Sequence, residues 1–337
     1  MDLRRVDIRY ETAPEISVVV PCFNEEGVIA ETHRRLRATL AEIGLPFELI
    51  YVDDGSRDQT LALLAGIQQS DARVRVVALS RNFGHQLAIT AGLNHSLGRA
   101  VVLIDADLQD PPEVIHEMIA RWREGYEVVY GTRLRRAGET AFKTKTAAWF
   151  YRLINRVSEI PIPLDTGDFR LLDRKAVDAL SSMPERDRFV RGLVSWVGFR
   201  QIAVPYDRAA RHAGVSKYSL LRMMSFAVDG ILSFSIVPLR LATFLGLAAT
   251  VASLTGAAAA ISFILATTFR PGPWLAVLLT GLFMGGVQLI CLGILGEYLG
   301  RIYGESKHRP LYVVRETMGF ENSVSDRSAA MAAQAGF

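Results

Sequence analysis

Cysteine is almost missing from this chain: only Cys22 and Cys291 occur among its 337 residues. Their wide separation excludes a disulfide framework and a cysteine-built zinc site, and it permits a reducing compartment. The 38 basic and 35 acidic residues leave a net charge of +3, too little for a surface that binds nucleic acid throughout. Residues 1–15 are charged and contain no apolar stretch, so we expect no secretory signal.

Charge is missing from two long apolar runs near the C-terminus, at 241–269 and 274–296. Each run exceeds the ~20 residues with which an α-helix crosses a bilayer. Only Arg-Pro-Gly-Pro at 270–273 separates them, which is too short to hold a domain. Two buried helices of a soluble protein are the alternative, but these lengths favour a transmembrane hairpin at residues 239–300.

Basic residues predict the orientation of this hairpin, because its turn carries Arg270 alone. Six others flank the outer ends of the two runs: Arg222, Arg240, Arg301, Lys307, Arg309 and Arg315. The positive-inside rule then places both termini in the cytoplasm, in a multi-pass protein of the inner membrane. Residues 216–238 mix aromatic, apolar and basic side chains, which predicts interfacial amphipathic helices. Segment 146–154 has the same mixture, although an amphipathic core helix explains it almost equally well.

Aliphatic runs and helical stretches alternate between residues 16 and 130. The predicted strands are 16–20, 47–52, 74–79 and 100–104, and the predicted helices are 26–43, 59–68 and 86–96. Strands that are buried on both faces and separated by such helices indicate βαβ units and a parallel sheet. Each predicted strand ends at polar residues, and open α/β sheets bind ligands at that edge.

Asp105 and Asp107 directly follow the fourth predicted strand. Two carboxylates two residues apart point to one side of an extended chain, and they suit Mg²⁺ or Mn²⁺, which share their shells with waters and substrate phosphates. Helix capping is the alternative, because Asp110 precedes two prolines at the start of a predicted helix. Capping accounts for Asp110 but leaves the other two carboxylates unexplained.

Asp53 and Asp54 end the second predicted strand, just before Gly55. A turn with an N-cap at Ser56 or Asp58 explains the residues that follow, but it does not require two adjacent carboxylates. One of these two carboxylates could accept hydrogen bonds from the base or the ribose of a ligand. The other would then lie toward a bound metal ion and support its site.

Together these segments resemble glycosyltransferase family 2, the nucleotide-diphosphate-sugar enzymes with the GT-A fold. The matching motifs are Val-Pro-Cys-Phe-Asn-Glu (20–25), Asp-Asp-Gly-Ser-Arg-Asp-Gln-Thr (53–60), Arg-Asn-Phe-Gly (81–84), Asp-Ala-Asp-Leu-Gln-Asp-Pro-Pro (105–112), Gly-Thr-Arg (131–133) and Asp-Thr-Gly-Asp-Phe-Arg-Leu-Leu-Asp-Arg (165–174). Two later motifs, Gly-Val-Ser-Lys-Tyr-Ser (214–219) and Gly-Glu-Tyr-Leu-Gly-Arg-Ile-Tyr (296–303), resemble the branch that glycosylates polyprenyl phosphates. That branch includes dolichol-phosphate mannose synthases and bactoprenol glucosyltransferases.

The resemblance implies roles for individual residues. Those that line the nucleotide-sugar pocket would be Pro21, Asn24, Glu25, Asp53, Asp54, Asp105 and Gln109. Those that hold a Mg²⁺ or Mn²⁺ ion would be Asp105, Asp107 and Gln109. Asp168 matches the carboxylate proposed as catalytic base, and the cations that hold phosphate groups would be Arg133, Arg211 and Lys217. The resemblance favours UDP-glucose as the donor, ahead of GDP-mannose.

The chemistry of such a transfer leaves a second interpretation of Asp168 open. Expelling a nucleoside diphosphate requires its charge to be neutralised, which a divalent metal and cationic side chains supply. A polyprenyl phosphate already has ionised oxygens, so it needs a general base less than a hydroxyl acceptor does. Asp168 could therefore orient a cation or the sugar, or it could bond to Arg170 or Arg174.

A functional role is less well supported for three further polar residues. His85 and His212 titrate near neutrality but lack a metal-ligand spacing, so we leave both out of the predicted site. A solvated surface position is the alternative for Arg211.

We therefore expect an α/β chain with four parts: a GT-A catalytic domain at 1–215, interfacial helices at 216–238, two transmembrane helices at 239–300 and a cytoplasmic tail at 301–337. The expected activity is inverting transfer of one sugar, glucose by preference, from a nucleotide diphosphate sugar to polyprenyl (undecaprenyl) phosphate at the cytoplasmic membrane face. We expect no nucleic-acid partner, and homo-oligomers are expected to form through the membrane part.

A processive polysaccharide synthase is one alternative, but residues 188–196 do not match its Gln-x-x-Arg-Trp motif. A non-catalytic scaffold or flippase subunit is another, and the acidic clusters at the strand ends disfavour it.

Overall fold

The computed structural model describes residues 13–134, 166–183, 185–186, 188–207, 237–266 and 273–320. Two predicted site residues, Arg211 and Lys217, lie outside these ranges. So do the segment 146–154 and nearly all of the predicted interfacial helices. Every other predicted site residue lies within the described part of the chain.

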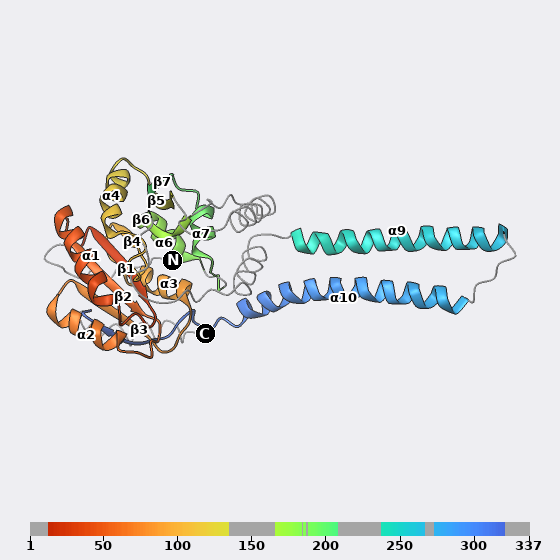
Figure 1. Ribbon diagram of the computed structural model, residues 1–337, viewed down its shortest axis with the longest axis horizontal. Helices are drawn as coiled ribbons and strands as arrows, with labels where there is room; N and C mark the ends of the chain where they lie inside the picture. Colours follow the sequence, from red (N-terminus) through yellow and green to blue (C-terminus); the bar gives the residue numbers. More distant parts are fainter. Residues whose placement is uncertain are drawn as a thin grey trace, which may run out of the picture.

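A mixed sheet of eight strands lies at the centre of the described domain, in the order β7-β5-β6-β4-β1-β2-β3-β8 (Figure 1). The strands are β1 (Ile16–Cys22), β2 (Phe47–Asp53), β3 (Val74–Leu79), β4 (Ala100–Leu103), β5 (Val128–Arg133), β6 (Thr166–Asp173), β7 (Gln201–Tyr206) and β8 (Val314–Met318). The neighbours among β1, β2, β3 and β4 pair in parallel, as the sequence predicts. β6 is antiparallel to β4 and β5, and β8 is antiparallel to β3, whereas β7 pairs with β5 in parallel. The sheet is therefore mixed, and the expectation of a parallel sheet holds for the first four strands but not for the whole sheet.

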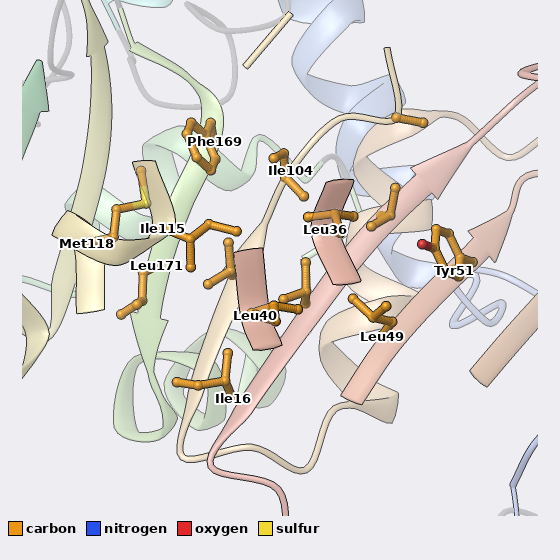
Figure 2. Close-up of a cluster of buried hydrophobic side chains, with 14 of the residues drawn as sticks. Ile16, Leu36, Leu40, Leu49, Tyr51, Ile104, Ile115, Met118, Phe169 and Leu171 are labelled. Carbon is orange, nitrogen blue, oxygen red and sulfur yellow. The ribbon is translucent and has the colours of Figure 1, made fainter. Parts of the chain in front are cut away.

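Helices cover both faces of the sheet, because successive side chains of a strand point to opposite sides. One face carries α1 (Ile29–Ile43), α2 (Thr60–Ser70) and, after the 3₁₀ turn η1 (Pro112–Val114), α4 (Ile115–Arg123); the other carries α3 (His85–His95), α6 (Arg174–Ser182) and α7 (Val190–Trp196). Ile16 of β1 belongs to one buried cluster with Leu36 and Leu40 of α1 (Figure 2). Val19 of the same strand belongs to the opposite cluster with Ile89 of α3.

The strand directions gather several loops at one edge of the sheet. β1, β2, β4 and β5 end at this edge, and the antiparallel β6 begins there. Leu103 of β4 pairs with Arg170 of β6, so the start of β6 lies opposite the loop after β4. Because β2 and β4 flank β1 on opposite sides, the strand order reverses at β1, which is where open α/β sheets bind ligands.

Two long helices, α9 (Val237–Ala266) and α10 (Pro273–Ser306), lie side by side and extend away from the sheet (Figure 1). The Cys291 thiol donates to the Ala242 carbonyl oxygen at 3.4 Å, which places the two helices in contact. Within the described residues, one helical stretch, Phe283–Ser306, is long and apolar enough to cross a membrane, and the apolar part of α9, Ala242–Gly256, is shorter. The two-helix transmembrane hairpin therefore stays a prediction.

The chain returns to the sheet after α10. The Ser80 amide donates to the Val313 carbonyl oxygen at 2.9 Å, and β8 then pairs with β3, starting with Val314 beside Leu79. β8 covers the edge of β3, whose backbone groups would otherwise be unpaired. The predicted tail at 301–337 thus contains the end of α10 and a strand. Val-Arg-Glu-Thr-Met is too short and too charged to indicate a strand on its own.

Two glycines allow a matched test of this packing. α3 lies so close to β1 that a Cβ added at Gly92 would collide with the side chain of Val19. Gly92→Ala should therefore lower the free energy of unfolding by about 1–3 kcal/mol through overpacking. Gly66→Ala on α2, where an added Cβ meets nothing within 4 Å, should raise it by about 0.5–1 kcal/mol because alanine favours a helix. Thermal unfolding of the full chain in detergent measures both changes; a Gly92→Ala variant as stable as the wild type would contradict the close contact.

Candidate active site

The loops after β1 and β2 are linked to each other by hydrogen bonds. The Asn24 amide donates to Ser56 Oγ at 3.0 Å, and the Arg57 amide donates to Asn24 Oδ1 at 2.8 Å. The Glu25 amide donates to the hydroxyl of Thr60, the first residue of α2, at 2.8 Å. Asn24 has φ 56°, a left-handed conformation that asparagine tolerates, and Pro21 is buried within β1. Three predicted pocket residues thus belong to one linked pair of loops and the strand before it.

Asp53 and Asp54 follow each other at the end of β2 but have different surroundings. Asp53 is buried and accepts long hydrogen bonds from the Ser56 amide, at 3.4 and 3.3 Å, and burial raises its pKa. Asp54 accepts hydrogen bonds from the amides of Phe83 and Gly84 at 2.7 and 2.9 Å. Asp54 therefore orders the loop before α3, and Asp53 is the better candidate for a ligand contact.

Asp105, Asp107 and Gln109 share the loop after β4. The Gln109 amide donates to Asp107 Oδ1 at 3.1 Å. Leu108 between them has φ 57°, a left-handed conformation that is strained for leucine, and its side chain is buried. Burial of this leucine stabilises a tight loop, so the three predicted metal and diphosphate residues are held on one short segment.

Asp168, near the start of β6, pairs with two cationic side chains. Arg191 of α7 donates from Nε to Oδ1 at 2.7 Å and from Nη2 to Oδ2 at 3.0 Å. His85 Nε2, on the first residue of α3, lies 3.1 Å from Asp168 Oδ2 and 3.5 Å from Asp105 Oδ1. One cluster therefore joins α3, α7, β6 and the loop after β4.

Burial and the charges of neighbouring side chains shift the pKa values of the residues in this cluster. Burial opposes the ionised form of Asp168, but the charges and hydrogen bonds of Arg191 and His85 hold its pKa well below the usual value. Burial also opposes protonation of His85, yet its hydrogen bond with Asp168 and the charge of Asp105 raise its pKa to about 9. Burial and neighbouring carboxylates raise the pKa of Asp105 to about 6, against the effect of His85. Near neutral pH, Asp168 is ionised and His85 is protonated.

The arginines closest to Asp168 in sequence are bonded elsewhere. Arg170 is buried and donates to the Gly167 carbonyl oxygen at 2.9 Å, and burial lowers its pKa to about 10. Arg174 donates from Nε to the Gly98 carbonyl oxygen at 2.9 Å. Asp168 thus bonds to residues that are distant in sequence, because β6 faces α3 and α7 at this edge.

Arg133 ends β5 beside Asp110 and Tyr206. Its Nε donates to the Tyr206 hydroxyl oxygen at 3.4 Å, and its Nη2 lies 3.8 Å from Asp110 Oδ1. The Tyr206 hydroxyl in turn donates a short hydrogen bond to Asp110.

The N-cap of η1 is Pro111, with no side-chain cap hydrogen bond, so the predicted capping role of Asp110 is wrong. Its carboxylate is buried and bonds to Tyr206 instead.

Comparison with known proteins places this site in a family. Residues 17–181 match the model of glycosyl transferase family 2. An uncharacterised glycosyltransferase of Bacillus subtilis (strain 168) is 48% identical over 308 residues, which cover 91% of this chain and 95% of that protein. The chain belongs to glycosyl transferase family 2. The resemblance seen in the motifs is thereby confirmed.

Other relatives of this family-2 chain carry more specific names. The bactoprenol glucosyl transferase of Shigella phage SfV is 43% identical over 303 residues, which cover 89% of this chain and 98% of that protein. The crystal structure of glucosyl-3-phosphoglycerate synthase from Mycobacterium tuberculosis in complex with phosphoglyceric acid matches at 25% identity with a TM-score of 0.45. That match covers 65% of this chain and 79% of the synthase.

Two residues of the candidate site, His85 and Arg191, are missing from the sequence prediction. His85 directly follows the Arg-Asn-Phe-Gly motif, so its place after a strand is a signal that could have found it. Arg191 lies in the segment 188–196, whose sequence indicates only that the processive motif is absent there. No local pattern connects Arg191 to Asp168, since the two elements meet only in the folded chain.

The residues present fit a divalent cation. Among the described residues, no three His, Cys, Asp or Glu side chains are grouped to bind a metal ion. Mg²⁺ and similar ions, however, often take one or two protein carboxylates and complete their shells with waters and substrate phosphates. Asp105 and Asp107 supply such oxygens on one loop. Burial, and after it the neighbouring carboxylates, raise the pKa of Asp105, and a bound cation would favour its ionised form.

The pairing of His85 with Asp168 predicts a measurable titration. In metal-free protein, His85 should titrate near pH 9, and Asp168→Asn should lower that pKa by at least about one unit, since the countercharge is lost and burial remains. Because the pKa is raised from 6.5, protonated His85 stabilises the fold fully below about pH 6.5, and this contribution is lost as the pH rises through about 9.

NMR titration of the full chain with ¹³C-labelled histidines measures this pKa, and His85→Gln assigns the resonance. The same His85 pKa in the wild type and in Asp168→Asn would contradict the ion pair.

Proposed function

We propose that this family-2 enzyme transfers a single sugar, with inversion, from a nucleotide diphosphate sugar to a polyprenyl phosphate at the cytoplasmic membrane face. The proposed donor is UDP-glucose and the proposed acceptor is undecaprenyl phosphate. The names of relatives support this choice: the phage SfV protein at 43% identity and an Escherichia coli (strain K12) prophage homolog at 41% are both described as bactoprenol glucosyl transferases.

The observation that carries the proposal is a link between the apolar helix α10 and the charged cluster. Glu305, in the last turn of α10, accepts a hydrogen bond from the Arg186 amide at 2.7 Å. The segment of Arg186 leads into α7, whose Arg191 pairs with Asp168. The end of a helix that is apolar enough to cross a membrane therefore adjoins the elements that form the site. An acceptor with its phosphate at the headgroup level suits this position.

The pairing of β8 with β3 supports a membrane hairpin. β7 precedes α9 along the chain, and β8 follows α10 and belongs to the same sheet as β7. Helices between these two strands that span a membrane would therefore cross it an even number of times. We therefore propose that residues 239–300 cross twice with both termini cytoplasmic, after a catalytic domain at 1–215 and interfacial helices at 216–238. A homo-oligomer formed through these helices stays a prediction.

We propose that Asp168 acts as a fixed anion rather than as a base. Its low pKa makes it a poor proton acceptor, and its two oxygens already accept hydrogen bonds from Arg191. The acceptor phosphate needs no deprotonation, because it reaches the site ionised. Asp168 instead orients Arg191 and His85, which remain cationic and can face phosphate oxygens.

The proposed reaction is one displacement. An ionised oxygen of the lipid phosphate attacks the anomeric carbon from the face opposite the leaving group. The bond from that carbon to the diphosphate oxygen breaks, and its electron pair stays with the nucleoside diphosphate. A divalent cation held by Asp105 and Asp107, with Gln109 on the same loop, would neutralise the charge of the leaving group.

Asp107→Ala tests the proposed metal and diphosphate loop. Transfer from radiolabelled UDP-glucose to undecaprenyl phosphate, with Mg²⁺ or Mn²⁺, should fall at least about 100-fold because the charge of the leaving group is less well neutralised. Membrane insertion should not change. Asp178→Asn on α6 is the matched control, since that side chain is 59% exposed, and it should keep the wild-type rate within about twofold. Full transfer by Asp107→Ala would remove this loop from the mechanism, and a wild type that glycosylates no polyprenyl phosphate would refute the proposed function.

Arg191→Lys tests the role assigned to Asp168. Lysine keeps the charge but loses the two parallel N–H donors, so kcat should fall at least about tenfold while the thermal midpoint shifts little. Arg200→Lys is the control, because Arg200 is exposed and stacks on the Tyr126 ring at 4.9 Å, away from the cluster. An Arg191→Lys variant with the wild-type kcat would show that the paired geometry is not needed.

A further inference from the structure

Asp110 belongs to the acidic loop after β4, but its carboxylate bonds to Tyr206 of β7. Its side chain is 1% exposed, and it accepts the hydrogen bond of the Tyr206 hydroxyl. A buried carboxylate next to a loop that is already rich in negative charge is costly unless it is paired. Asp110 therefore needs Tyr206, and the pairing joins the acidic loop to the end of β7.

Tyr206 is held in a site that fits its ring. Its ring packs edge-on against Phe169 of β6, with centroids 5.6 Å apart and planes at 87°. Gly131 of β5 leaves room for the ring, because a Cβ at that position would lie 2.7 Å from Tyr206 Cε1. Packing on both sides therefore fixes the position of the hydroxyl between Asp110 and Arg133.

The hydroxyl of Tyr206 donates to Asp110 and accepts from Arg133, so it connects the two charges. Arg133 Nη2 also lies 3.8 Å from Asp110 Oδ1. A Cβ on Gly167 would lie 2.9 Å from Arg133 Nη2, which places the guanidinium directly over the residue before Asp168. The Arg133 side chain remains 24% exposed, so a ligand can reach it.

We propose that Tyr206 and Asp110 are positioning residues that hold Arg133 over Gly167 and tie it to the loop of Asp105 and Asp107. An arginine side chain has many rotamers, and a preorganised guanidinium binds phosphate oxygens without first having to be ordered. The proposal rests on the function proposed above, in which Arg133 contacts the phosphates. It assigns to the last aspartate of the Asp-Ala-Asp-Leu-Gln-Asp motif a task different from those of the first two.

A double-mutant cycle tests this inference without requiring an acceptor. The measured quantity is the dissociation constant of UDP with Mg²⁺, and of GDP if UDP does not bind, by calorimetry on the full chain in detergent. Tyr206→Phe removes only the hydroxyl and should weaken binding about 5- to 30-fold, as expected for a hydrogen bond to a charged group. In an Arg133→Gln background the same substitution should change the constant by less than about twofold, since Tyr206 then has no cation to position.

Tyr312→Phe is the matched control. It also removes a tyrosine hydrogen bond, the one that Asn94 Nδ2 donates to the Tyr312 hydroxyl oxygen at 3.0 Å, but this bond lies in the segment that precedes β8. The substitution should therefore leave the constant unchanged. If Tyr206→Phe lowers the thermal midpoint so far that binding cannot be measured, Asp110→Asn replaces it, because the amide oxygen can still accept from Tyr206 while the charge near Arg133 is gone. The same non-additivity with Arg133→Gln is then expected.

Equal effects of Tyr206→Phe in both backgrounds would overturn the inference, because the hydroxyl would then act on the fold alone. No effect in either background would overturn it as well. A wild type that binds UDP and shows the cycle but does not glycosylate polyprenyl phosphate would refute the proposed acceptor and leave the positioning role intact. A wild type that binds neither nucleotide would count against both.

Discussion

The buried ion pair between Asp168 and Arg191 is the interaction on which the site depends. Asp168 has a side chain only 8% exposed, and an ionised carboxylate in that position is costly unless it is paired and hydrogen-bonded. Arg191 satisfies both oxygens, and His85 adds a second cation. The start of β6 and the first turns of α3 and α7 must therefore meet at one point. Any arrangement that separates them leaves a charge buried without a partner.

The antiparallel strand β6 makes this meeting possible. Since β6 lies between β4 and β5 and runs antiparallel to them, its first residues lie at the edge where β4 and β5 end. Asp168 therefore lies close to Asp105, and each carboxylate disfavours ionisation of the other. Arg191 and His85 hold the pKa of Asp168 low in spite of its burial, whereas burial and the neighbouring carboxylates raise the pKa of Asp105. The second property suits a position that is completed by a cation.

The segment after α10 connects the apolar helices to this edge. Glu305 contacts the backbone before α7, and β8 pairs with β3, so the helix is attached to the domain at two points. The orientation of α10 is thereby coupled to that of the sheet. In a membrane, this attachment would hold the site at a constant height relative to the lipid phosphates.

Several features follow from sequence patterns because their causes are local. The strands β1 to β4 are aliphatic runs that stop at polar residues, and the structure reproduces them to within two residues at either end. The expectation that Asp110 caps a helix is wrong, because its carboxylate accepts a hydrogen bond from Tyr206 on the distant strand β7 instead. β8 has no local signal at all, since its pairing with β3 supplies the hydrogen bonds that make it a strand.

By itself the sequence determined the family, the order of the first strands and helices, and the acidic loops at their ends, because each depends on residues that are neighbours along the chain. Only the tertiary structure decided that Arg191 and His85 hold Asp168, that Asp54 orders a loop, and that Asp110 bonds to Tyr206. Those contacts join residues from separate elements, and their distances depend on the order, direction and register of the strands. The spacing of residues along the chain does not contain that information.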